Sequence, residues 1–211
     1  MILTTDRIDR LKTFMVQKMG SKARFSMHKI LDTLCARRLP ADLSTSSEGR
    51  TLGGYVLKLS PRLVLIHTIN NQLKLDGMSV IPIEDISRIV PDPDDGLINI
   101  ITQVRGQVAG GRSLPPIQNL GQMLESFAKS RELVAVHFGR VDPEVCFVGL
   151  VVKVGKEQFR FRKVDSEGRW YVRESVYRIA NLTRVSFGDH YLEALELVLK
   201  VRGDTFSSTS V

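Results

Sequence analysis

Two pairs of matching segments, separated by nearly one constant offset, limit the fold more than any other feature of this chain. Residues 54–58 (Gly-Tyr-Val-Leu-Lys) resemble residues 149–153 (Gly-Leu-Val-Val-Lys), and residues 83–89 resemble residues 179–185 at their branched, hydroxyl and arginine positions. The offsets are 95 and 96 residues. Because both pairs occur in the same order at almost the same offset, the sequence predicts a duplicated unit.

Each unit contains alternating, β-branched runs that predict short strands separated by turn residues. A glycine-bearing strand (54–59, 146–154) is followed by a second strand (63–67, 158–164) and by a closing region (80–89, 177–187). Residues 97–104, 133–138 and 170–173 are further strand candidates. In the closing blocks we expect Ile86, Ile89, Leu182 and Val185 in the core, and Arg88 and Arg184 with their stems across the end of the unit or in contact with a ligand.

The segments outside these strands have the patterns of helices and of a linker. Apolar residues spaced by three and four predict a helical N-terminal segment over residues 1–42, which a polar linker at 43–50 separates from the first unit, residues 51–112. Ser113 is the expected cap of a connector helix within residues 113–131. The second unit covers residues 132–202, where 191–201 fit either a helix or a buried strand, and residues 203–211 form a polar tail.

The resulting fold class is mainly β, within the α+β group. The order of glycine-bearing strand, second strand, hairpin and closing strand resembles the small Sm-like, or more broadly SH3-like, barrels over residues 51–104 and 133–188. That resemblance implies two tandem barrels with a helical cap and a connector helix. Sm proteins that bind RNA place Asp and Asn after the glycine-bearing strand, where this chain has Ser60-Pro61-Arg62 and Gly155-Lys156-Glu157. The resemblance therefore transfers architecture and no RNA contacts.

Composition excludes several classes of protein. The chain of 211 residues is 43% apolar and 25% charged, which is typical of globular proteins. Cys35 and Cys146 stand far apart without a second cysteine or a nearby histidine at ligand spacing, which argues against disulfides and zinc. The longest apolar run is too short to cross a bilayer, so we expect no membrane insertion and a cytoplasmic, bacterial-type protein.

No motif recommends catalysis. Residues 106–113 match a phosphate-binding loop except that Arg112 stands where the motif has Lys, so a nucleotide hydrolase is the weakest of three hypotheses. The four histidines are scattered, and the carboxylates around Asp92 lie among prolines that indicate a solvated turn. We expect no enzyme activity, no cofactor and no metal.

One segment has the pattern of a binding face. In residues 158–163, strand alternation places Arg160 and Arg162 on one side and two phenylalanines on the other. Across the turn at 165–168, further cations and an aromatic ring follow. The candidate binding residues are Arg160, Arg162, Lys163, Arg169, Trp170 and Arg173. The alternative is an ordinary solvated face, since Glu157, Glu167 and Glu174 are interspersed.

The net charge of +7 permits acidic partners. The sequence therefore predicts a non-catalytic binding protein, an adaptor or inhibitor that holds an acidic protein partner through barrel surfaces. The alternative is a single-stranded RNA-binding Sm-like protein that uses the same basic face. Open sheet edges would also permit an oligomer.

Overall fold

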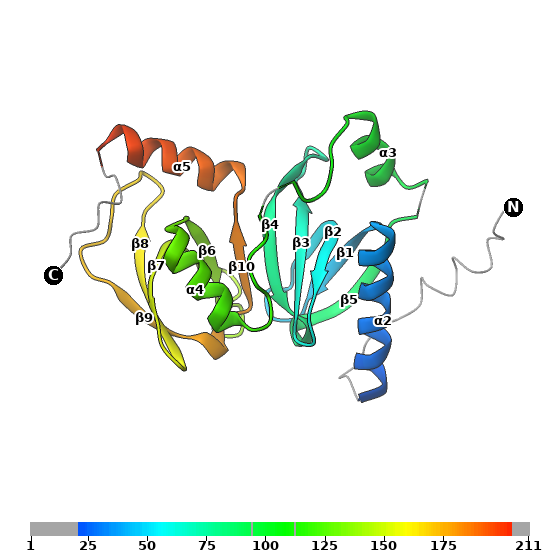
Figure 1. The fold of residues 1–211 in the computed structure, drawn as a ribbon, viewed down its shortest axis with the longest axis horizontal. Helices are drawn as coiled ribbons and strands as arrows, with labels where there is room; N and C mark the ends of the chain where they lie inside the picture. Colours follow the sequence, from blue (N-terminus) through cyan, green and yellow to red (C-terminus); the bar gives the residue numbers. More distant parts are fainter. Residues whose placement is uncertain (1–20, 94, 112, 204–211) are drawn as a thin grey trace, which may run out of the picture.

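A computed structural model describes residues 21–93, 95–111 and 113–203 as a mainly β protein of the α+β class (Figure 1). Its ten strands form one antiparallel sheet in the order β5-β1-β2-β3-β4-β10-β6-β7-β8-β9. The first half of the molecule comprises α2, β1–β5 and α3, and the second half comprises α4, β6–β10 and α5. The first of the two expected N-terminal helices lies outside the described residues, as do residues 204–211 of the tail.

The elements of the first half are α2 (Ser21–Arg37), β1 (Pro40–Thr45), β2 (Thr51–Leu59), β3 (Leu63–Ile69), β4 (Leu75–Pro82), the 3-10 turn η1 (Ile83–Asp85), β5 (Ile86–Pro91) and α3 (Leu97–Val104). Those of the second half are α4 (Leu120–Ser130), β6 (Val134–His137), β7 (Cys146–Val154), β8 (Gln158–Val164), β9 (Ser175–Arg178), η2 (Ile179–Asn181), β10 (Arg184–Phe187) and α5 (His190–Val201). Each half thus has a helix, four strands, a 3-10 turn and a closing strand in the same order.

The matching glycines occupy matching places. Gly54 on β2 lies against β3, and Gly149 on β7 lies against β8. In each pair the register shifts shortly after the glycine, between Val56 and Lys58 and between Val151 and Lys153. A bulge at this point bends the strand and increases its twist. The glycine and the bulge together let the long strand curl over its own half of the core.

The two halves meet along β4 and β10. Val80 is the register partner of Val185, and Ser79 is that of Ser186, whose hydroxyl oxygen lies 2.8 Å from the hydroxyl of Ser79. One apolar cluster crosses this seam, because Leu65 and Val80 of the first half share it with Phe127 of α4 and other residues of the second half. The seam is therefore a continuous sheet over a continuous core.

Helices cover further apolar clusters on both halves. Leu31 and Leu34 of α2 pack in a second cluster on the first half. On the second half, α5 contributes Leu192, Leu195 and Leu199 to a third cluster, so residues 191–201, which fitted either type from sequence, form a helix. The side chain of Asp189 caps this helix by accepting a hydrogen bond from the amide of Leu192 at 2.8 Å. No helix among the described residues has the length and apolarity needed to span a membrane.

Three sequence predictions of elements were wrong. Residues 97–104 form α3, since their apolar residues recur at helical spacing and the carboxylate of Asp92 accepts from the amide of Asn99 in its first turn. The linker predicted at 43–50 begins inside β1, whose alternating burial is hidden by its small polar residues. Residues 170–173 make only an isolated bridge from Trp170 to Val164.

The connector also differs from expectation. Its helix starts at Leu120, where the side chain of Asn119 accepts a hydrogen bond from the amide of Gln122 at 2.9 Å, and Ser113 does not cap it. Residues 106–111 follow α3 and lead into an irregular segment. A phosphate-binding loop joins a strand directly to a helix, so this arrangement does not fit one.

Candidate functional site

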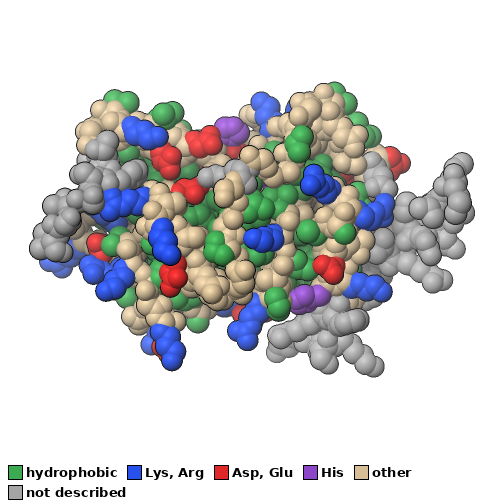
Figure 2. Space-filling view, viewed as in Figure 1, with side chains coloured by type: hydrophobic (Ala, Val, Ile, Leu, Met, Phe, Trp, Pro, Cys, Tyr) green, Lys and Arg blue, Asp and Glu red, His purple; other side chains and the backbone are tan. Residues whose placement is uncertain are grey.

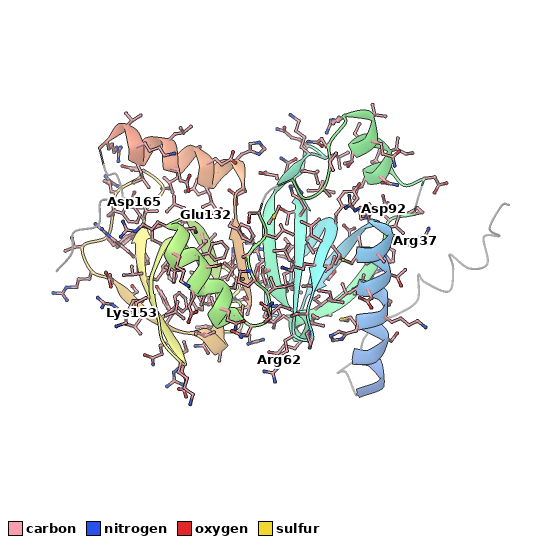
Figure 3. The ribbon with its side chains drawn as sticks, viewed as in Figure 1. Arg37, Arg62, Asp92, Glu132, Lys153 and Asp165 are labelled. Carbon is pink, nitrogen blue, oxygen red and sulfur yellow. The ribbon has the colours of Figure 1, made fainter. Side chains whose placement is uncertain are left out.

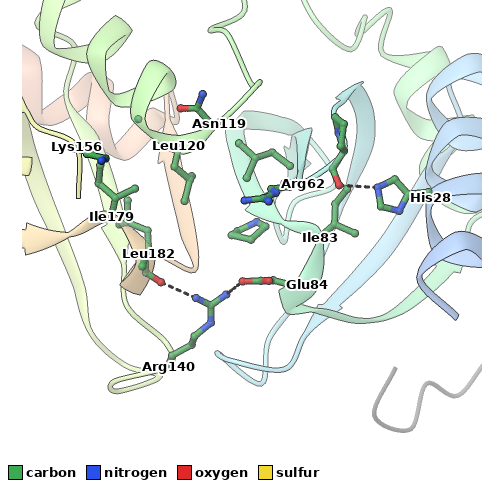
Figure 4. A pocket seen from close by; sticks show the side chains of 15 residues that line it. His28, Arg62, Ile83, Glu84, Asn119, Leu120, Arg140, Lys156, Ile179 and Leu182 are labelled. Atoms are coloured by element: carbon green, nitrogen blue, oxygen red, sulfur yellow. Dashed lines mark hydrogen bonds and ion pairs between the residues drawn. The ribbon is translucent and has the colours of Figure 1, made fainter. Parts of the chain in front are cut away.

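A groove of about 640 Å³ opens where the two halves meet, at the ends of their matching turns (Figure 4). From the first half come Arg62 of the β2–β3 turn and η1; from the second come the start of α4, Lys156 of the β7–β8 turn, and η2. Its volume lies in the range of ligand-binding clefts. Its position follows from the sheet order, because the β2–β3 turn with η1 and the β7–β8 turn with η2 lie on the two sides of the β4–β10 seam.

Local hydrogen bonds fix the turn that presents Arg62. The hydroxyl of Ser60 accepts from the amide of Leu63 at 3.0 Å, and the amide of Ile83 donates to the carbonyl of Arg62 at 2.8 Å. On the other side, His28 Nε2 lies 3.0 Å from the carbonyl of Pro61. The backbone of this turn is thus held to both β4 and α2, while the Arg62 side chain is left exposed.

Arg140 closes one end of the groove and holds the two halves together. Its guanidinium donates to Glu84 at 2.7 Å, to both carboxylate oxygens of Asp85 at 2.7 and 3.1 Å, and to the carbonyl of Ala180 at 2.8 Å. Burial raises the pKa of Asp85, and the nearby charge of Arg140 offsets only part of that effect. These contacts engage every nitrogen of the guanidinium, so Arg140 joins η1 to η2.

The free charges of the groove are cationic. Within the described parts of the chain, the side chains of Arg62 and Lys156 make no hydrogen bond or ion pair. Figure 4 places them on opposite sides of the opening, with Asn119 and Leu120 at the start of α4 between them. The first amides of a helix have no partner within the helix and carry partial positive charge. The opening therefore attracts negative charge from three directions.

The floor of the groove is aliphatic. Leu63, Ile83, Leu120, Ile179 and Leu182 line it together with prolines, and none of the described lining residues is Phe, Tyr or Trp. Bases of single-stranded nucleic acids are usually held by stacking on such rings. The lining suits aliphatic side chains better than nucleobases.

A buried polar network lies at the seam beside the groove. Glu48, in the turn after β1, accepts from Arg184 at 2.7 and 3.1 Å and from the hydroxyl of Thr183 at 3.1 Å. The side chains of Glu48 and Arg184 are only 1% and 10% exposed. Burial alone would raise the pKa of Glu48, but the hydrogen bond and charge of Arg184 bring it below its usual value. Arg184 thus forms a buried ion pair with Glu48, whereas Arg88 at the matching position is exposed.

The same network contains a histidine and a cysteine that the sequence analysis treated as isolated. His137 and Cys146 are register partners on β6 and β7, with Sγ 3.6 Å from Nε2. Arg184 lies 3.1 Å from Nδ1, which must accept, so Nε2 carries the proton. Burial, followed by the charge of Arg184, lowers the pKa of His137 to about 3, and burial raises the pKa of Cys146. His137 therefore cannot act as a base for this thiol near neutral pH.

The low pKa of His137 predicts acid sensitivity. The folded protein binds fewer protons here than the unfolded chain, whose histidine pKa is about 6.5. Stability should be intact above this pH and fall by up to about 1.4 kcal/mol for each pH unit below it. Urea unfolding between about pH 7.5 and 5 measures the slope. His137→Gln should flatten it, and an equal slope in both proteins would contradict the assignment.

The predicted binding residues lie mainly on the outer side of β8 and in the loop beyond it. Phe159 and Phe161 are buried, and Arg160 and Arg162 are exposed, as alternation predicts. Lys163 lies on the other side, 4.8 Å from the ring of Phe147 and 4.7 Å from that of Tyr171. The structure therefore does not bring all six residues onto one face.

Most of these cations already have internal partners. Arg160 pairs with Glu174 at 2.6 Å, and Arg169 pairs with Asp165 at 2.9 Å and with Glu167 at 2.8 Å. Arg162 lies 4.9 Å from the Trp170 ring, and Arg173 is exposed. In Figure 2, Lys and Arg side chains are spread over the visible face of the molecule. The groove differs from this face because its two free cations flank a cavity.

Comparisons with known proteins do not place the chain in a family. No family model matches it, and no curated protein is similar to it. The crystal structure of YcgR in complex with c-di-GMP from Escherichia coli aligns with 89% of this chain and 96% of that chain, at 9% identity and a TM-score of 0.19. A likeness of this size supports no inference about fold or ligand. In the described residues, no group of three or more His, Cys, Asp or Glu could hold a metal ion.

Proposed function

We propose that this chain is a non-catalytic binding protein, an adaptor or inhibitor built from two Sm-like small barrels, and that its junction groove holds an acidic segment of a protein partner. The shared order of helix, strands, 3-10 turn and closing strand in the two halves supports the duplicated architecture. The proposal moves the main contact from the outer side of β8 to the groove.

One observation supports the acidic ligand most directly: Arg62 and Lys156, unpaired in the described structure, face a common aliphatic cavity from the two halves. Carboxylates of the partner would pair with these cations and with the first amides of α4, while its aliphatic side chains cover Ile83 and Ile179. Single-stranded RNA remains the second candidate, since phosphates would meet the same charges. The lack of aromatic rings in the described lining favours the peptide.

Charge reversal on both sides of the groove tests the proposal. We expect Arg62→Glu with Lys156→Glu to weaken binding of a fluorescent peptide of alternating glutamate and leucine by roughly tenfold or more, because attraction becomes repulsion. Fluorescence anisotropy at low and moderate salt measures the affinity. Lys74→Glu with Arg88→Glu, two exposed positions elsewhere, carries the same change in net charge and should bind nearly as the parent does.

The outcomes separate the candidates. Tighter binding of a uridine oligonucleotide than of the peptide, lost in the same double variant, would favour RNA. Equal weakening by both double variants would show that only net charge matters and would overturn the groove as the site.

A further inference from the structure

The sheet ends at β9, and this edge can accept another strand. Ile179 donates its amide to the carbonyl of Glu157 at 2.9 Å, and Tyr177 is the register partner of Phe159. Hydrogen-bonded pairs alternate along an antiparallel ladder, so Tyr177 bonds to β8. The N–H and C=O groups of Val176 and Arg178 consequently point away from the sheet.

The opposite edge, β5, lacks one of the outward backbone N–H donors that a partner strand would use. Asp92 donates its amide to the carbonyl of Pro40 at 2.8 Å, so Val90 bonds to β1, and Ile89 and Pro91 point outward. Pro91 has no N–H to offer, and proline is a common protection of edge strands. At β9, by contrast, both outward residues keep their donors.

The side chains beside β9 indicate the chemistry of a partner strand. Val176 lies opposite Arg160, and its side chain is 59% exposed. Arg178 shares this outer face by alternation, and Lys153 is the register partner of Arg160 on the next strand. Arg178 and Lys153 are exposed and make no ion pair in the described part of the chain. Figure 3 shows Lys153 on the outer side of the second half, far from Arg62 at the junction.

The cations beside β9 favour an acidic partner strand over a second copy of this chain. A second copy that paired through its own β9 would place two sets of the same cations, Arg178 with Lys153, on one face of the joined sheet, which disfavours self-association. An extended segment with alternating acidic and branched apolar residues would place carboxylates near Arg178 and Lys153 and an apolar side chain on Val176. We propose that β9 binds such an acidic segment of a partner protein as an eleventh strand, at a surface separate from the groove.

Amide exchange on the intact protein tests this directly. A peptide of alternating glutamate and valine should slow exchange at the outward amides of Val176 and Arg178 by roughly tenfold or more at saturation, because those donors become hydrogen-bonded. The same peptide with N-methyl groups along its pairing edge keeps its charge but cannot donate, and should give no protection. NMR spectra of the labelled protein measure both.

Two variants separate this surface from the groove. Val176→Pro removes an outward donor without touching the bonds to β8, and should lose the protection at Arg178 while its melting temperature stays near that of the parent. The double variant Arg62→Glu with Lys156→Glu should keep the protection, so failure of either surface is distinguishable. Equal protection by both peptides, or protection confined to amides around Gly121, would overturn the edge site, as would protection by a uridine oligonucleotide and not by the peptide.

Discussion

Replacing Glu48 by alanine is expected to lower the free energy of unfolding by about 3–5 kcal/mol, among the largest losses from any single change at the seam. The reason is the position of Arg184, whose side chain is 10% exposed and whose guanidinium would lose the Glu48 carboxylate that lies 2.7 Å away. A buried charge without a partner is far more costly than an exposed one. Urea unfolding monitored by circular dichroism measures the loss.

A second variant separates charge from packing at this position. Glu48→Met combined with Arg184→Met replaces both charges by apolar chains of similar length, and should recover most of the stability lost in the single variant. If the double variant is no more stable than Glu48→Ala, the loss comes from packing or from the Thr183 and His137 contacts, and the ion-pair explanation is wrong.

Replacing Gly149 by alanine should destabilise the protein by about 3 kcal/mol or more. A β-carbon at this position would lie 2.0 Å from the backbone carbonyl oxygen of Arg162 on β8, too close for a rotamer change to relieve. The strands β7 and β8 would have to separate at the bend. Gly54 has the same restriction, with a β-carbon 2.3 Å from the carbonyl oxygen of His67.

The matched control lies on the same hairpin. At Gly155 an added β-carbon would come no closer than 3.3 Å to a neighbouring atom, the carbonyl oxygen of Gln158. Gly155→Ala should therefore change stability by less than about 1 kcal/mol, since it also restricts the unfolded chain. Thermal unfolding of the two variants side by side gives the comparison. Equal melting temperatures would mean that the bend at Gly149 is not a close backbone approach.

Sequence patterns correctly predicted burial and exposure where these depend only on alternation along one strand. The segments around Gly54 and Gly149 do occupy equivalent hairpins, and Ile86, Ile89, Leu182 and Val185 are buried as expected. Alternation alone also separated Phe159 and Phe161 from Arg160 and Arg162. These inferences need only the period of a strand.

Prediction failed where context outside the segment decides. The β-branched run at 97–104 is a helix because Gly96 and Asp92 start a turn there, which strand propensity does not register. Residues 40–45, which the sequence divides between the end of the helical segment and the start of the linker, form a strand because β2 and β5 lie on both sides of them. The pairing of residues 40–45 cannot be found in their own periodicity. The apolar spacing of residues 97–104 does fit a helix, but their β-branched composition outweighed it in the prediction.

The groove was missed for a related reason. Arg62 and Lys156 are 94 positions apart, and each taken alone is an ordinary turn cation. A partial signal did exist, since both lie in the turn that follows a glycine-bearing strand. The position in the second half that matches Arg62 is Glu157, because the amides of Ile83 and Ile179 donate to the carbonyls of Arg62 and Glu157. Using it would have required knowing that β4 pairs with β10 and turns those places toward each other.

The shared seam constrains how this protein can be divided or recombined. A fragment ending after the first half would present β4 as a bare edge, with Leu65 and Val80 no longer covered from the far side. Such a fragment would need a chaperone or a surrogate strand to stay dispersed. Although the sequence resembles a tandem repeat, neither half can be exchanged without changing the sheet and core that both share. We therefore expect the two halves to have diverged together.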